Sequence, residues 1–228
     1  MSIIITWLGH AAFLLDINGH SVLLDPFITD NPLATVTANE LNPEMILLSH
    51  AHDDHVGDSV DIAKRSGARL LCNFEIGNWL LANGISDVVQ LNPGGTYQCD
   101  FLSARWTIAH HSSSFHDGTY GGQPNGYVIN AHGKRIYFAG DTDVFLDMQL
   151  IGDLNIDVAI LPIGGTYTMG PDEALKAVEF IRPRVVIPMH YNTFPPIMQN
   201  AFEWANRVNN FTKASPIVLD PGASHTID

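Results

Sequence analysis

Short apolar runs alternate with polar, turn-forming segments along the whole chain. The first 25 residues are predicted to form strands joined by tight turns. Residues 13–17 and 22–24 are largely apolar, and Asn18-Gly19 between them is a strong signal for a β-hairpin. Similar runs predict further strands at residues 45–48, 69–72, 87–91, 97–102, 104–109, 126–130, 135–139, 157–162, 184–189 and 216–219. The polar segment 26–44 is punctuated by prolines and is expected to be a loop.

Helical patterns fill several stretches between these strands, namely residues 58–66, residues 74–83, the segment between Pro171 and Pro183, and residues 197–209. Proline suits the first position of the third helix, and the acidic residues after it favour the first turn. Strands that interleave with helices predict a layered α/β architecture. No linker or low-complexity segment interrupts the chain, so a single domain over residues 1–228 is expected.

Strong metal ligands are concentrated in one short loop, His50-Ala51-His52-Asp53-Asp54-His55. Residues i and i+2 of an extended segment project to the same side, so His50 and His52 can bind one metal ion. Asp54 and His55 lie beyond the turn and can reach a second ion. Imidazole nitrogen and carboxylate oxygen together suit Zn²⁺, Fe or Mn²⁺ better than Ca²⁺ or Mg²⁺. The alternative is a solvated, histidine-rich turn.

Residues that can bind metals also stand directly after other predicted strands. They are His50, the pair His110-His111, Asp141 and His190. Ligands in α/β proteins gather at the carboxyl ends of strands, where the loops open onto one edge of the sheet. A single histidine after a strand is usually structural, but four such strand ends favour one shared metal site.

These motifs resemble the signature of the metallo-β-lactamase superfamily. The matching motifs are His50-x-His52-x-Asp54-His55, His111, Gly140-Asp141-Thr142 and His190. Three more segments are similar to a compact family of metal-dependent hydrolases related to the ascorbate-6-phosphate lactonase-like branch, namely Leu161–Gly165, Thr168–Pro171 and Pro188–Phe194. The resemblance implies a four-layer αββα sandwich, in which helices flank two central sheets and a dinuclear site lies on one edge.

The resemblance also implies a ligand set, with His50, His52 and His111 on one ion, Asp54, His55 and His190 on the other, and Asp141 bridging them. The ions are expected to be Zn²⁺, and Mn, Fe or Ni are also compatible with these ligands. Two neighbouring histidines compete for one position. The family pattern favours His111 because His111-Ser112-Ser113 matches it, whereas the residues alone do not decide against His110.

Asp25 matches a residue that in such proteins holds a ligand histidine in place, although a simple turn aspartate before Pro26 is the alternative. Gly164-Gly165 are candidate donors of backbone N–H groups to a substrate oxyanion, or form only a tight turn. Tyr191 and Asn192 are candidate substrate contacts beside a metal ligand, or serve loop packing. His116 is expected to be exposed rather than to coordinate a metal.

The implied reaction is hydrolysis of an ester, lactone, amide or phosphodiester by a metal-bridging hydroxide. Divalent ions lower the pKa of bound water from 15.7 toward ~7. Asp54 is the catalytic residue expected to orient the hydroxide and accept its proton. Two ions, two carboxylates and a hydroxide leave a net charge of about +1, which attracts an anionic or electron-rich substrate atom. The compact chain leaves no room for a large recognition domain, so the expected substrate is a small molecule, and an anionic one is compatible with this charge.

Composition excludes several other classes of protein. The formal charge of −13 argues against a nucleic-acid groove. No apolar run approaches 18 residues and the first residues lack a basic segment, so no membrane span and a cytoplasmic location are expected. Cys72 and Cys99 make no disulfide framework and are expected to be free thiols. The oligomeric state stays open.

Three other functions have some support in the sequence. Ser112-Ser113-Ser114 lies beside two histidines, but the chain has no GxSxG elbow of a serine hydrolase. A di-iron redox protein of the same fold is the main alternative, although there is no flavodoxin-like domain and His55 stands where an acidic ligand would suit iron better. A non-catalytic metal-binding protein is the third, and the complete ligand set argues against it.

Overall fold

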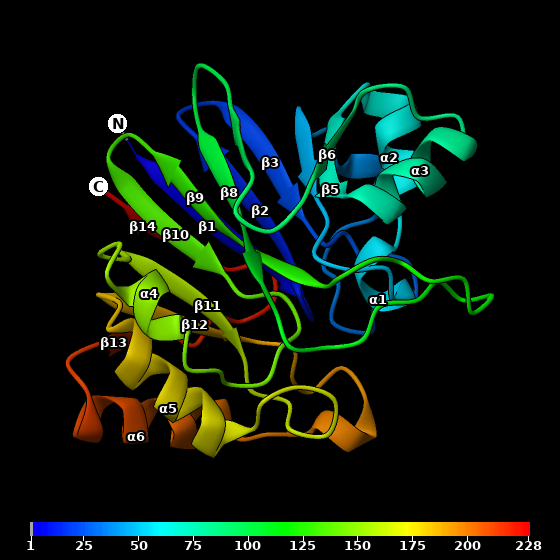
Figure 1. Cartoon of the computed structure of the whole chain (residues 1–228). Helices are drawn as coiled ribbons and strands as arrows, with labels where there is room; N and C mark the ends of the chain where they lie inside the picture. The colour runs from blue at the N-terminus through cyan, green and yellow to red at the C-terminus, as the bar shows by residue number, and fades with distance from the viewer. Residues whose placement is uncertain (1) are drawn as a thin grey trace.

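The computed structural model describes residues 2–228 and consists of two seven-stranded sheets that pack face to face. The first sheet has the order β14-β1-β2-β3-β4-β5-β6 and the second β13-β12-β11-β10-β9-β8-β7. Helices α2 and α3 cover the outer face of the first sheet, and α4, α5 and α6 cover that of the second (Figure 1). This is the αββα sandwich that the sequence predicted.

The strands of the first sheet are β1 (Ile3–Gly9), β2 (Ala12–Ile17), β3 (His20–Leu24), β4 (Met45–Leu47), β5 (Arg69–Asn73), β6 (Val88–Leu91) and β14 (Ser224–Ile227). Those of the second are β7 (Thr96–Gln98), β8 (Ser103–Ile108), β9 (Asn125–Ala131), β10 (Lys134–Phe138), β11 (Val158–Pro162), β12 (Val185–Met189) and β13 (Ser215–Pro216). The helices are α1 (Asp53–Val56), α2 (Ser59–Ser66), α3 (Phe74–Ala82), α4 (Met148–Gly152), α5 (Pro171–Ile181) and α6 (Ala201–Phe211), with 3-10 turns at Ala38–Glu40 and Pro195–Ile197.

Each sheet combines an antiparallel meander with a parallel half. Strands β1, β2 and β3 are antiparallel, whereas β3 to β6 run parallel to one another. In the second sheet β7 to β10 are antiparallel and β10 to β13 are parallel. The parallel halves bring the carboxyl ends of several strands to one edge, which is where loops in α/β proteins carry function.

Large apolar side chains fill the space between the sheets. Phe13 and Phe138 meet edge to face with ring centroids 6.4 Å apart, and Trp106 and Tyr127 are buried. The Tyr127 hydroxyl donates across the sandwich to the carbonyl of Leu48 at 2.9 Å. This hydrogen bond anchors β9 to the backbone just before the histidine-rich loop. A well-packed interior of this kind holds the edge of the sandwich rigid.

Most predicted elements are confirmed, and the differences have local causes. The last helix begins at Ala201 instead of residue 197, because a 3-10 turn at Pro195–Ile197 precedes it and the Asn200 side chain caps it by accepting from the Glu203 N–H. Three elements were missed, α1, α4 and β14. The predicted strand 97–102 is shorter and ends at Gln98.

Two further expectations concern the surface and the thiols. Cys72 and Cys99 are free, Cys72 fully buried and Cys99 partly so. Among residues 2–228, none of the helices has the length and apolar character needed to cross a bilayer.

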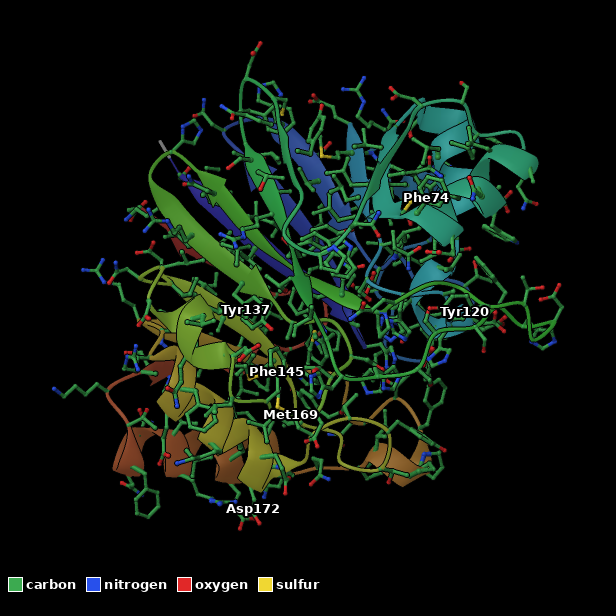
Figure 2. All side chains as sticks on the ribbon, in the orientation of Figure 1. Phe74, Tyr120, Tyr137, Phe145, Met169 and Asp172 are labelled. Carbon is green, nitrogen blue, oxygen red and sulfur yellow. The ribbon has the colours of Figure 1, made fainter. Side chains whose placement is uncertain are left out.

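Figure 2 shows Tyr120 on the loop after β8, beside α1 and away from Tyr137 on β10. This loop lies next to the histidine-rich segment, because the Ala51 N–H donates to the Ser113 hydroxyl oxygen at 3.2 Å.

Candidate metal centre

Asp141 lies at the centre of a cluster of histidines at one edge of the sandwich. Its Oδ2 is 3.0 Å from His190 Nε2, 3.3 Å from His55 Nε2 and 3.6 Å from His111 Nε2. These residues come from the ends of β8, β10 and β12 and from α1. One carboxylate oxygen thus faces three imidazole nitrogens contributed by segments far apart in the sequence.

The first group of potential ligands is His50, His52 and His111. One ring nitrogen of each lies within 4.8 Å of the others, and His50 Nε2 is 2.9 Å from His52 Nδ1. The Ser49 hydroxyl gives its hydrogen to Asp25 Oδ2, so it accepts one from His50 Nδ1 at 2.9 Å. His50 Nε2 therefore carries a lone pair, as a metal ligand must. The predicted i, i+2 pair does converge in space.

The second group contains Asp54, His55 and His190, and with them His10. Asp54 and His55 lie in α1, a single helical turn that directly follows His52. His55 also packs against His50 of the first group, with ring centroids 4.1 Å apart, so the two groups adjoin. All seven predicted ligands are thus gathered at one edge.

Several buried polar atoms of this cluster have no hydrogen-bond partner within the described part of the chain. They are His55 Nε2, both ring nitrogens of His190 and Asp141 Oδ1. Buried polar atoms without partners are rare, since each loses its hydrogen bonds to water without compensation. A bound cation would satisfy them, because imidazole and carboxylate are the donor types of zinc, manganese and iron sites. The residues present therefore fit a metal.

The protonation states also suit metal binding. Burial alone would raise the pKa of Asp141, but His190 and His55 outweigh it and hold that pKa well below its usual range. Burial and the neighbouring His55 lower the pKa of His50 well below its ordinary value. Burial disfavours charge on His55 too, yet Asp141 and Asp25 raise its pKa. The carboxylates thus favour a positive charge between them, which a metal cation would provide.

Asp25 lies behind the cluster, on the side away from the cavity. Its Oδ2 accepts from His55 Nδ1 at 2.7 Å, and its Oδ1 accepts from the Ser49 N–H at 2.7 Å. Both Asp25 and His55 are fully buried. The hydrogen bond places the proton of His55 on Nδ1 and leaves Nε2 free on the side of Asp141. This is the geometry expected of a residue that orients a ligand histidine.

His10 was not predicted, although it is buried within the second group. Its Nε2 lies 3.2 Å from Asp54 Oδ2 and its Nδ1 lies 2.8 Å from Thr193 Oγ1. The signal that could have identified it is a histidine directly after an apolar strand, because His10 follows β1 as the predicted ligands follow other strands. Burial and the nearby His190 lower the pKa of His10 to about 4, so its ring is neutral at pH 7.

The other histidines considered lie outside the cluster. His110 is exposed, and its ring stacks on Phe145 with centroids 4.9 Å apart. His116 is also exposed and pairs with Asp53 on the surface at 2.8 Å. The structure therefore brings His111 to Asp141 and turns His110 away from it.

A cavity of about 510 Å³ opens directly onto the cluster. It is lined by His52, Asp54, His111, Ser112, Asp141, Thr166, Tyr167 and His190. The four tentative substrate contacts, Gly164, Gly165, Tyr191 and Asn192, are not among these residues.

Those four residues make packing and loop contacts, and the Gly165 N–H donates to the Met169 carbonyl at 3.3 Å. Tyr191 is buried and stacks on Trp7 with centroids 5.3 Å apart. The Asn192 side chain accepts from the backbone N–H of Gln199 at 2.8 Å. A Cβ on Gly164 would stand 2.4 Å from the His190 carbonyl, so this glycine permits a close backbone approach. Thr166 and Tyr167 are the cavity residues that the sequence did not suggest.

Comparisons with known proteins agree with this architecture. A family model described as the β-lactamase superfamily domain matches residues 4–190. A UPF0173 metal-dependent hydrolase from Thermus thermophilus is 48% identical over 203 residues, covering 89% of this chain and 90% of that protein. A protein of the same name from Symbiobacterium thermophilum is 48% identical over 227 residues, covering 98% of this chain and 99% of that one.

A solved structure extends the similarity to three dimensions. Igni18, a metallo hydrolase from the hyperthermophilic archaeon Ignicoccus hospitalis, superposes with a TM-score of 0.92 at 38% identity. The match covers 100% of this chain and 99% of Igni18. The chain therefore belongs to the β-lactamase superfamily and, within it, to the UPF0173 metal-dependent hydrolases.

Proposed function

We propose that this protein hydrolyses an ester, lactone, amide or phosphodiester of a small molecule at a centre that holds two divalent cations. The observation that carries the proposal is the position of Asp141, whose Oδ2 faces the Nε2 atoms of His190, His55 and His111 at 3.0–3.6 Å. A carboxylate that faces several imidazole nitrogens at this range is the arrangement that a shared metal ligand requires.

We assign one ion to His50, His52 and His111, the other to Asp54, His55 and His190, and a bridging role to Asp141. The two groups of ligand atoms support this assignment, as do the buried nitrogens and oxygen that lack partners. Zinc suits the donor set best, and manganese, iron or nickel are compatible with it. Divalent ions at such a site supply Lewis acidity, which polarises a scissile carbonyl or phosphoryl oxygen and makes water a better nucleophile.

Asp54 is the residue of this chain that we assign to proton handling. It lines the cavity, and its side chain is 30% exposed. Burial would raise its pKa, but the hydrogen bond from His10 and the charge of His55 hold that pKa below its usual range. An ionised carboxylate at the cavity wall can orient a water molecule and accept its proton.

The cavity supports a small-molecule substrate. Ser112, Thr166 and Tyr167 contribute hydroxyl groups to its wall, and none of its lining residues is lysine or arginine. The charge of an anionic substrate would therefore have to be balanced by the bound cations alone. The single domain, the cytoplasmic location, the absence of a nucleic-acid partner and the relation to the ascorbate-6-phosphate lactonase-like branch stay predictions.

Metal analysis combined with a substrate panel tests the proposal. Protein purified without added metal should contain about two ions per chain and should hydrolyse at least one of a lactone, a p-nitrophenyl ester, an anilide or bis(p-nitrophenyl) phosphate. Asp141→Ala should retain about one ion and lose activity, whereas the exposed Asp143→Ala control should retain both ions and activity. Redox cycling without hydrolysis of any of these compounds would favour the di-iron alternative. Two tightly held ions in Asp141→Ala would remove the bridging role.

A further inference from the structure

His10 is held rigidly at the side of the cluster. Its side chain is buried, and its ring packs edge to face against Phe27 and Phe194, with centroids 5.6 Å and 5.5 Å apart. The backbone carbonyl of His10 accepts from the Trp7 indole N–H at 2.9 Å and from the His190 N–H at 3.1 Å. The imidazole therefore has little freedom to rotate or to move away from Asp54.

The hydrogen bonds of the ring indicate which nitrogen carries the proton. Thr193 Oγ1 lies 2.8 Å from His10 Nδ1 but 3.5 Å from the Tyr191 carbonyl, so its hydrogen is better used toward His10. Nδ1 then accepts, and the proton of a neutral ring resides on Nε2. This nitrogen faces Asp54 Oδ2 at 3.2 Å, where a lone pair would be repelled by the carboxylate and an N–H is attracted.

We propose that His10 is a positioning residue that, supported by Thr193, donates a hydrogen bond to Asp54 Oδ2 and so fixes the orientation of this carboxylate at the cavity. The inference rests on the proposed function, because Asp54 is the group assigned there to orient water. It also distinguishes His10 from the ligands, although His10 shares a potential metal group with Asp54, His55 and His190. A ring nitrogen that donates a proton to Asp54 has no lone pair for a metal.

Nuclear magnetic resonance on the metal-loaded protein gives a readout that does not depend on activity. Long-range ¹H–¹⁵N spectra should show the Nε2–H tautomer of His10, and Thr193→Val should change that pattern, whereas Thr193→Ser should preserve it. An Nδ1–H tautomer in the unmodified protein would overturn the proposal. Because this measurement needs no substrate, it separates failure of the inference from failure of the proposed hydrolase function.

Kinetics and metal content then test the role itself, with bis(p-nitrophenyl) phosphate or the most rapidly hydrolysed compound of the panel as the probe. His10→Ala should retain both ions but lower kcat roughly 10- to 100-fold, as expected when a partner that orients an active-site group is removed. KM should change little. His10→Gln, whose amide N–H can reach Asp54, should recover part of the loss.

Thr193→Val keeps the test valid if His10→Ala does not fold, because it replaces only the supporting hydroxyl. It should lower kcat, as His10→Ala does. Thr193→Ser keeps the hydroxyl and should therefore have a kcat close to that of the unmodified protein. Loss of one ion in His10→Ala would make His10 a metal ligand and overturn the positioning role. An unchanged kcat in both His10→Ala and Thr193→Val would overturn it as well.

Discussion

His55 Nδ1 donates a hydrogen bond to Asp25 Oδ2 at 2.7 Å, and both side chains are fully buried. Asp25 also accepts from the N–H and the hydroxyl of Ser49, the residue that precedes His50. One carboxylate thus controls the tautomers of two adjacent imidazoles, His55 directly and His50 through Ser49. Such control from behind a ligand is a common feature of metal centres.

Asp25→Asn is expected to weaken metal binding by roughly 10- to 100-fold. The asparagine amide has an N–H₂ group where Ser49 and His55 need an acceptor. The backbone should not be strained, because asparagine tolerates the positive φ of 38° at this position. Competition with a chromogenic chelator measures the affinity. The exposed Asp100→Asn is the matched control and should bind metal normally. Unchanged affinity in Asp25→Asn would mean that His55 keeps its tautomer without the carboxylate.

The neighbouring histidines after β8 should respond differently to substitution. His111→Ala is expected to lose metal and activity because its Nε2 is 3.6 Å from Asp141 Oδ2, within the proposed ligand set. His110→Ala removes an exposed ring that stacks on Phe145, so it should retain both ions. Mass-spectrometric metal analysis of the two variants measures the difference. The reverse outcome would overturn the assignment of the third histidine.

Gly140 is expected to be indispensable for placing Asp141. Its φ is +62°, and a Cβ there would stand 2.6 Å from the Asn125 carbonyl and 2.8 Å from Ser49 Cβ. Gly140→Ala should lower the free energy of unfolding by about 1–2 kcal/mol because alanine disfavours the left-handed backbone conformation. The clash of its Cβ should lower it by roughly a further 1–3 kcal/mol. Metal content should fall too, because Asp141 must shift.

Gly133→Ala is the control for Gly140→Ala. Gly133 has φ +76° and open space around the site of a Cβ, so it shares the backbone cost without the clash. Urea unfolding should show that Gly133→Ala is the milder variant and binds metal normally. Equal stability losses in the two variants would mean that the surroundings of Gly140 adjust without cost.

The metal-free protein is expected to lose stability as the pH falls from 6.5 toward 4. The folded-state pKa of His10 is about 4, because burial opposes the charged form, against 6.5 in an ordinary environment. The unfolded chain therefore takes up a proton before the folded chain does, and this group alone reduces the free energy of unfolding by about 3 kcal/mol across that interval. Above pH 6.5 the penalty is absent.

Urea unfolding of chelator-treated protein across this pH range measures the loss. His10→Gln should show a smaller loss, because it removes the group that resists protonation. The exposed His132→Gln is the control, since His132 also has a positive φ, 49° against 54° for His10. Identical pH dependence of His10→Gln and the unmodified protein would contradict the prediction.

Local patterns in the sequence were sufficient for much of the fold. Helices α2, α3 and α5 were predicted because capping, proline position and apolar spacing act within a few residues. Strand β14 was missed because Ser224–Ile227 is largely polar, and its extended conformation depends on pairing with β1 at the other end of the chain. Helix α4 was missed because five residues carry too short a pattern.

The sequence by itself determined the chemistry of the candidate ligands and their positions after apolar strands, because residue type and local spacing are both visible in one dimension. The tertiary structure alone decided that His111 faces Asp141 while His110 stacks on Phe145, since the backbone bends after β8 and its course there depends on packing. It also decided that His10 meets Asp54. That contact is produced by packing the end of β1 against α1, and no local pattern encodes the distance between two such segments.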